Sequence, residues 1–186
     1  MVMEAVAVRR LTLSEFLARP ETEPASELID GEVVQKPVPR IEHNFPVGNL
    51  YLWLFAHPAT SAGIALTEQG LPFPGSEMGN LRVPDLVFFA AGREFPDEGY
   101  PSEPPDLAVE VRSRGQTLRS LQQKLAFLRE AGTVCTLLVD PQRKSVEVDD
   151  GQHHFTALAE DEVVLESLGG FAFKVIDLFG RPRPPR

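Results

Sequence analysis

Apolar residues recur at helical spacing in two long segments of the chain. The first lies near residues 43–57, where the apolar residues share one helix face: Val47, Leu50, Leu54 and Phe55. The second spans residues 118–128, with leucines three or four residues apart, Thr117 as a good N-cap and Gly132 just past the end. The sequence therefore predicts two long helices, and a shorter one that ends before Pro20.

Short runs of apolar and β-branched residues alternate with turn signals along the rest of the chain. The stretch "SELIDGEVV" is typical of a β-hairpin, because an Asp-Gly pair separates two strand-like runs. One hydrophobic strand is predicted across "LRVPDLVFFAAG", and three more follow the second helix in "TVCTLLVD", "KSVEVDD" and "HHFTALA". The last residues before position 180 predict one further strand and a short helical turn. Helices and strands are thus mixed, as in an α/β or α+β fold.

The segment "LAVEVRSRG" predicts an interior strand that carries both an acid and a base. Leu107, Val109 and Val111 face one way by the two-residue period of a strand. Glu110 and Arg112 then share the other face, although the surrounding residues are typical of a buried strand. Charged side chains at such positions need a partner or a function.

Two more acids interrupt strand-like runs: Glu27 in "SELID" and Asp85 in "RVPDLVFF". An ionised carboxylate is almost never fully buried without a partner, so two interpretations follow. In one, these two acids and Glu110 form structural ion pairs with cations such as Arg112 and Lys124. In the other, the three acids converge on a divalent metal ion, since Mg²⁺ and Mn²⁺ prefer hard oxygen ligands.

Length and charge narrow the function classes only in part. With 186 residues, the chain is long enough for a single domain, expected over residues 1–180, followed by a flexible, basic, proline-rich tail at 181–186. The formal charge of −9 argues against a protein that coats nucleic acid non-specifically. It does not argue against an enzyme that acts on nucleic acid with the help of divalent cations.

The remaining features of the composition favour an intracellular protein. The single cysteine, Cys135, excludes an intramolecular disulfide and is expected to be a small buried residue. Neither a secretory signal nor a run of about 18 consecutive apolar residues is visible. A cytoplasmic protein without membrane contact is therefore expected.

Six short motifs occur in a fixed order along the chain: "SELIDGEVV", "EHNFPVGNL", "RVPDLVFF", "PPDLAVEVRS", "LQQKLAFLREAG" and "LLVDPQRKSVEV". On these motifs the chain resembles the Uma-two family of restriction endonucleases, within the PD-(D/E)XK nuclease superfamily, from about residue 11 to 180. The resemblance implies a restriction-endonuclease-like core: an α/β (mixed α+β) domain with a central mixed β-sheet flanked by helices, and a C-terminal β-meander.

The resemblance also implies roles for the residues at matching positions. Asp85 matches the aspartate of the superfamily's "PD" motif, and Glu110 matches its second metal-binding acid. Glu27 matches an acid at the first strand, so these three would hold Mg²⁺ or Mn²⁺. Arg112 stands where the superfamily has a lysine, and the lysine that many family members carry on the following helix corresponds to Lys124.

The arginine at position 112 matters because arginine cannot be deprotonated. Arg112 is therefore expected to bind phosphate, or Glu27, rather than to act as a base. Lys124 is expected to contact the carboxylates and position the attacking water, since a buried lysine can change protonation near neutral pH. His43, in "EHN", is a weaker candidate for contact with the substrate.

The leading hypothesis is a Mg²⁺-dependent endonuclease that hydrolyses DNA in the cytoplasm. By analogy with enzymes that cut two strands with two subunits, a homodimer or higher homo-oligomer is expected. Two alternatives stay open. One is a catalytically inactive protein of the same fold that binds nucleic acid. The other is a structural or regulatory protein whose acids are ion-paired.

Overall fold

The computed structural model describes residues 9–75 and 78–184, and the chain divides into two compact units. The first unit contains the residues up to Val38 together with Gly70–Val83. The second contains Pro39–Gln69 and the chain from Pro84 onwards. That residues 1–180 fold as one domain stays a prediction.

A small four-stranded antiparallel sheet and a short helix make up the first unit. The strand order is β2-β1-β5-β4, and the elements are α1 (Leu13–Leu17), β1 (Ser26–Ile29), β2 (Glu32–Gln35), β4 (Leu71–Phe73) and β5 (Asn80–Arg82). Asp30 and Gly31 have φ values of 48° and 81°, so the predicted Asp-Gly hairpin is confirmed. Thr12 caps α1 and forms a capping box with Glu15.

The second unit is built on a six-stranded mixed sheet in the order β10-β9-β8-β7-β6-β3. In this sheet β7 and β8 run parallel, joined by α3, and the other neighbouring pairs are antiparallel. The bounds are α2 (Ile41–Ala56), β3 (Ile64–Thr67), β6 (Leu86–Phe89), β7 (Leu107–Val111), α3 (Leu118–Glu130), β8 (Cys135–Asp140), β9 (Ser145–Asp149) and β10 (His154–Leu158). A central mixed sheet flanked by helices, with the β8-β9-β10 meander after α3, confirms the predicted fold class.

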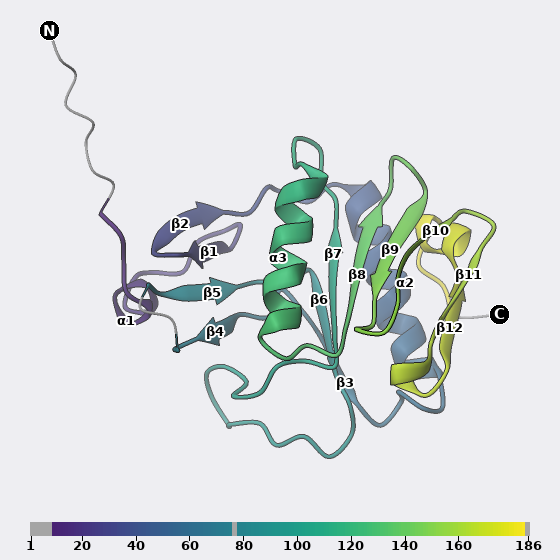
Figure 1. The fold of residues 1–186 in the computed structure, drawn as a ribbon, viewed down its shortest axis with the longest axis horizontal. Coiled ribbons are helices and arrows are strands. Elements are labelled where there is room, and N and C mark those ends of the chain that lie inside the picture. Colours follow the sequence, from purple (N-terminus) through teal and green to yellow (C-terminus); the bar gives the residue numbers. More distant parts are fainter. Residues whose placement is uncertain (1–8, 76–77, 185–186) are drawn as a thin grey trace, which may run out of the picture. The chain divides into compact units, whose positions relative to one another are not determined.

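The two long helices cover opposite faces of this sheet. In Figure 1, α3 lies on the near side of the sheet, where it contacts β7 and β8, and α2 lies behind the sheet. Val109 and Val111 of β7 belong to the same core cluster as Leu50 and Leu54 of α2, whereas Glu110 contacts α3. The alternation predicted for β7 is therefore confirmed.

No helix in the described part of the chain is long and apolar enough to cross a membrane.

The prediction of one continuous strand across "LRVPDLVFFAAG" is wrong. The chain forms two strands there, β5 in the first unit and β6 in the second, separated by Val83, Pro84 and Asp85. Proline has no N–H to donate to a strand neighbour, and its ring restricts the preceding residue, so the pairing breaks at Pro84. The break places Asp85 directly before β6.

The C-terminal segment also differs from the prediction of one strand and a helical turn. It forms an antiparallel hairpin of β11 (Glu162–Leu165) and β12 (Phe171–Lys174), with 3₁₀ turns at Glu166–Leu168 and Val175–Phe179. Gly169 and Gly170, with φ values of 66° and 77°, lie between the two strands. Only the glycine backbone makes this left-handed reversal easy, and apolar periodicity does not reveal it.

The described part of the basic tail lies against α2. Trp53 donates its indole N–H to the Arg183 carbonyl at 2.8 Å, and the side chain of Asn49 accepts the Arg183 N–H at 3.1 Å. The Asn49 amide group also donates to the Gly180 carbonyl at 3.0 Å. These bonds hold the chain through Arg183, whereas residues 185–186 of the tail predicted to be flexible lie outside the described residues.

The single cysteine of the chain offers a clean test of this packing. Cys135 is fully buried on β8, as predicted, and burial raises the pKa of its thiol from 9.0 to about 12. Because only the thiolate reacts, we expect no reaction of the native protein with Ellman's reagent at pH 8, and one thiol per chain after unfolding in guanidinium chloride. Equal reaction rates before and after unfolding would contradict the buried position.

Candidate active site

Asp85 is fixed between neighbouring strands by both its backbone and its side chain. Its N–H donates to the Val109 carbonyl at 3.1 Å, and its carboxylate Oδ2 accepts the Val111 N–H at 2.7 Å. Val109 and Val111 are the residues on either side of Glu110 in β7. The structure therefore brings together, within the second unit, the two acids that the sequence places on separate strands.

His43 lies in the first turn of α2 and is buried beside Asp85. Its Nε2 is 3.0 Å from Asp85 Oδ2, close enough to donate a hydrogen bond to the carboxylate. Its Nδ1 is 3.2 Å from Oδ1 of Asn44. The histidine ring is thus held from both nitrogens and orients the acid. Its expected contact with a substrate stays a prediction.

Glu110 and Lys124 form a buried ion pair between β7 and α3. Lys124 Nζ lies 2.5 Å from Glu110 Oε1, and the two side chains are 9% and 2% exposed. The apolar stripe of α3 packs on the sheet through three buried leucines: Leu121, Leu125 and Leu128. Because the alkyl stem of Lys124 can lie along this apolar surface, its ammonium group reaches the acid. Lys124 thus contacts Glu110, and its expected role in positioning a water stays a prediction.

Arg112 pairs with Asp140, an acid that the sequence analysis did not single out. Arg112 Nη1 is 2.9 Å from Asp140 Oδ2, and its Nε donates to the Gln116 carbonyl at 3.1 Å. In the parallel pair of β7 and β8, Val111 lies opposite Val139, so the next residue of each strand is a neighbour. The signal in the sequence is an acid that ends the buried run "TLLVD".

Glu27 belongs to the first unit, where it is buried on β1. Its Oε1 accepts the Val83 N–H at 2.6 Å. Burial lowers the pKa of Arg82 in the same unit, and the negative charge of Glu27 opposes that shift. Glu27 therefore has a stabilising role within its own sheet, and its convergence with Asp85 and Glu110 stays a prediction.

The chemistry of Asp85 and Glu110 suits a hard divalent cation. Mg²⁺ is commonly bound through one or two carboxylates together with waters and substrate phosphates, so two adjacent acids fit part of its ligand set. Within residues 9–75 and 78–184, no group of three or more His, Cys, Asp and Glu side chains is arranged to hold a metal ion. A three-acid site that includes Glu27 therefore stays a prediction.

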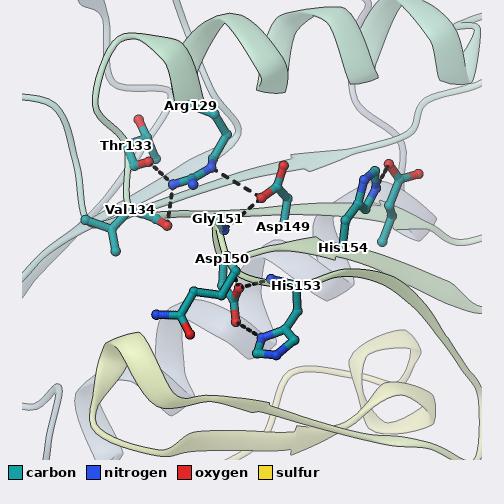
Figure 2. A network of polar contacts seen from close by, with 10 residues as sticks. Arg129, Thr133, Val134, Asp149, Asp150, Gly151, His153 and His154 are labelled. Atoms are coloured by element: carbon teal, nitrogen blue, oxygen red, sulfur yellow. Dashed lines mark hydrogen bonds and ion pairs between the residues drawn. The ribbon is translucent and has the colours of Figure 1, made fainter.

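A further polar network involves the end of α3 and the hairpin of β9 and β10 (Figure 2). Arg129 donates to two backbone carbonyls that follow α3. His153 lies 3.4 Å from Asp150, whereas His154 lies 2.8 Å from Glu147. These adjacent histidines contact different acids, because His153 lies in the turn and His154 begins β10. The network supports the hairpin and does not form a shared metal site.

The match to known families agrees with this geometry. A family model, Uma2, described as "Putative restriction endonuclease", matches residues 13–175. The chain belongs to the Uma2 family. No curated protein sequence matches the chain.

The Uma2 chain also resembles a solved structure along nearly its whole length. That crystal structure, of "a putative nuclease belonging to DUF820 from Anabaena variabilis ATCC 29413", shares 26% sequence identity with this chain at a TM-score of 0.78. The match covers 91% of this chain and 97% of the other. The resemblance inferred from the motifs is thus confirmed. Family and fold indicate a restriction-endonuclease-like nuclease, a class that generally uses divalent metal ions.

Removal of Lys124 is expected to destabilise this Uma2 protein strongly, because Glu110 would stay buried without its cation. Breaking one side of a buried ion pair costs about 3–5 kcal/mol. We expect Lys124→Met, which keeps an apolar stem, to lower the free energy of unfolding in urea by about that amount. The double variant Lys124→Met/Glu110→Gln should recover much of the loss, because no buried charge remains.

Lys174→Met is the matched control for this experiment. Lys174 is exposed on β12, so its replacement should change the free energy of unfolding by less than about 0.5 kcal/mol. If the two single variants were equally stable, the ion pair would have no structural role.

Proposed function

We propose that this Uma2 protein is an endonuclease that hydrolyses phosphodiester bonds of DNA with Mg²⁺ or Mn²⁺ bound at Asp85 and Glu110. The observation that carries the proposal is the pair of buried acids, Asp85 directly before β6 and Glu110 on the neighbouring strand β7, with Lys124 Nζ 2.5 Å from Glu110 Oε1. Carboxylates for the ion and a cation beside them suit metal-assisted hydrolysis of a phosphodiester. Membership of a nuclease family supports the same class of reaction.

The protein's part is to hold the two acids in place. A divalent ion, when bound there, neutralises charge on the phosphate and makes a bound water more acidic. Asp85 is oriented by the Val111 N–H and by His43, and Glu110 by Lys124. In this proposal His43 is a positioning residue that acts through Asp85, and its place beside the acid also brings it near a bound phosphate.

Lys124 and Arg112 then have different tasks. In the reaction a water loses a proton as its oxygen bonds to phosphorus, and the bond from phosphorus to the leaving oxygen breaks as that oxygen gains a proton. Lys124, beside Glu110, orients the water and can exchange a proton, because a buried lysine titrates more readily than arginine. Arg112 stays charged and binds a phosphate oxygen.

The setting we propose is a cytoplasmic homodimer or higher homo-oligomer acting on DNA. Two such sites would allow both strands of a duplex to be cut. Exposed apolar side chains on α2 support a self-association surface: Tyr51, Leu52 and Phe55 are 37%, 40% and 42% exposed.

A second candidate is a structural or regulatory protein without catalysis, and one observation favours it. Both buried acids of the site have a basic side chain within ion-pair distance, His43 at 3.0 Å from Asp85 and Lys124 at 2.5 Å from Glu110. Under this alternative the acids serve stability alone. A catalytically inactive protein of the same fold that binds DNA would combine both descriptions.

DNA cleavage by isosteric variants separates these candidates. We expect the wild-type protein to cut plasmid DNA with Mg²⁺ or Mn²⁺ and to leave it intact in EDTA. Asp85→Asn and Glu110→Gln should each lower the rate by about 100-fold or more, because the charge that binds the ion is lost. Asparagine keeps an oxygen that can accept the Val111 N–H, so the thermal midpoint of Asp85→Asn should stay close to wild type.

Glu147→Gln is the matched control, because Glu147 is an acid of the same sheet that contacts His154 instead. It should cut DNA at the wild-type rate. Wild-type cleavage by Asp85→Asn would refute the proposed site. A wild-type protein that never cuts, combined with a large fall in the thermal midpoint of Asp85→Asn, would point to the structural alternative.

Replacement of Lys124 by arginine tests whether the lysine supplies more than charge. Lys124→Arg keeps a cation beside Glu110 but cannot give up a proton. If proton exchange matters, cleavage should fall by about 100-fold or more, whereas the free energy of unfolding changes little. A wild-type cleavage rate for Lys124→Arg would show that a positive charge alone is sufficient.

A further inference from the structure

We propose that Arg112 and Arg143, both in contact with Asp140, form a phosphate-binding pair for the nucleic-acid backbone beside Glu110. We call these two residues the arginine pair. The inference rests on the proposed function, because it names the backbone contact of the same site. It adds two residues, Asp140 and Arg143, that neither the motifs nor the ion-binding acids include.

The charges around Asp140 do not balance. Its Oδ2 is 2.9 Å from Arg112 Nη1 and 3.9 Å from Arg143 Nε. Two guanidinium groups thus share one carboxylate oxygen, and one positive charge is left in excess. A phosphate oxygen placed between them would compensate that charge, and charge-assisted bonds from arginine to phosphate are among the strongest hydrogen bonds in proteins.

Asp140 is held rigidly, so it can fix Arg112 in advance of binding. The residue is 2% exposed, and its Oδ1 accepts the N–H groups of Gln142 at 2.9 Å and Arg143 at 3.3 Å. Arg112 is fixed from its other side, because its Nε donates to the Gln116 carbonyl at 3.1 Å. Side chains ordered before binding lose less conformational entropy when the ligand arrives.

Both arginines keep donors that a ligand can use. The Arg143 side chain is 67% exposed, and among the described residues its guanidinium donates no hydrogen bond. Arg112 is 22% exposed, and in the same part of the chain its Nη2 donates none. A planar guanidinium can bind two phosphate oxygens at once, so these donors suit a phosphate ligand.

The place of the pair in the fold favours a substrate role. Arg112 lies two residues beyond Glu110, and the parallel strands β7 and β8 end at the same edge of the sheet. The segment that leads from this edge into α3 adds two exposed arginines, Arg114 and Arg119, of which Arg114 lies 3.5 Å from Glu42. In a chain of net charge −9, such a local concentration of arginine gives a polyanion a site of approach.

A purely structural role for the pair predicts a different result. Ion pairs between exposed side chains contribute little to stability, and the Arg143 contact at 3.9 Å is long and exposed. Arg143→Gln should therefore leave the thermal midpoint unchanged. An effect of this variant on DNA binding would then come from the lost phosphate contact.

The test is the salt dependence of DNA binding, measured by fluorescence anisotropy with a labelled duplex in EDTA. Each phosphate contact adds about one unit to the slope of log affinity against log salt. We expect Arg143→Gln to lower the slope by about one and to weaken binding at low salt. The double variant Arg112→Gln/Arg143→Gln, which removes both guanidinium groups, should lower the slope by about two.

Arg19→Gln is the control, because it removes the same charge from an exposed arginine of the first unit. An unchanged slope for Arg143→Gln, an equal fall for Arg19→Gln, or no DNA binding by the wild type would overturn the arginine pair. Cleavage with Mg²⁺ is measured on the same preparations. A wild type that binds through the pair but never cuts would overturn the proposed function and leave the pair standing.

Discussion

A carboxylate inside a β-sheet requires a compensating cation, and the architecture of the second unit depends on how Glu110 meets this requirement. Glu110 is 2% exposed on β7, one of the two central strands of the unit's sheet, where a charge without a partner would be very unfavourable. Lys124 meets the requirement from α3. The helix must therefore pack on β7 in one register along its axis, and the leucine stripe provides the apolar contact that holds it there. The same ion pair thus links the stability of the fold to the reaction proposed for the site.

The break at Pro84 has a comparable effect on Asp85. If the apolar run "LRVPDLVFF" had continued as one strand, Asp85 would have been an interior residue of that strand. Because proline ends β5 and β6 starts afresh, Asp85 lies at a strand end, where its carboxylate can bond to the Val111 N–H of the next strand. Asp85, directly before β6, thus lies next to Glu110 in the interior of β7.

Lys124 and Arg112 pair with different acids in the second unit. Arginine two residues after Glu110 cannot serve as a base, and the structure gives it a different acid, Asp140. The lysine on α3 takes its place beside Glu110. The two cations thus form separate pairs, Arg112 with Asp140 and Lys124 with Glu110.

The sequence by itself determined what depends on neighbours along the chain. The two-residue period of "LAVEV" determined that Glu110 faces away from the apolar core, and the leucine spacing determined the face of α3 and hence the reach of Lys124. The Asp-Gly hairpin was equally local, because two residues with positive φ are enough to reverse the chain. The ordered motifs also singled out Asp85, although its partner was not visible in them.

Tertiary structure decided the contacts between segments far apart in the chain. His43 beside Asp85, and Arg112 beside Asp140, depend on where α2 crosses the sheet and on the parallel register that sets Val111 opposite Val139. The separate hairpin of β11 and β12 likewise depends on pairing that apolar periodicity does not encode. Periodicity reports only which face of its own element a residue occupies. Which element lies against that face is determined by the packing of the whole unit, because apolar surface can be buried against many partners of similar shape.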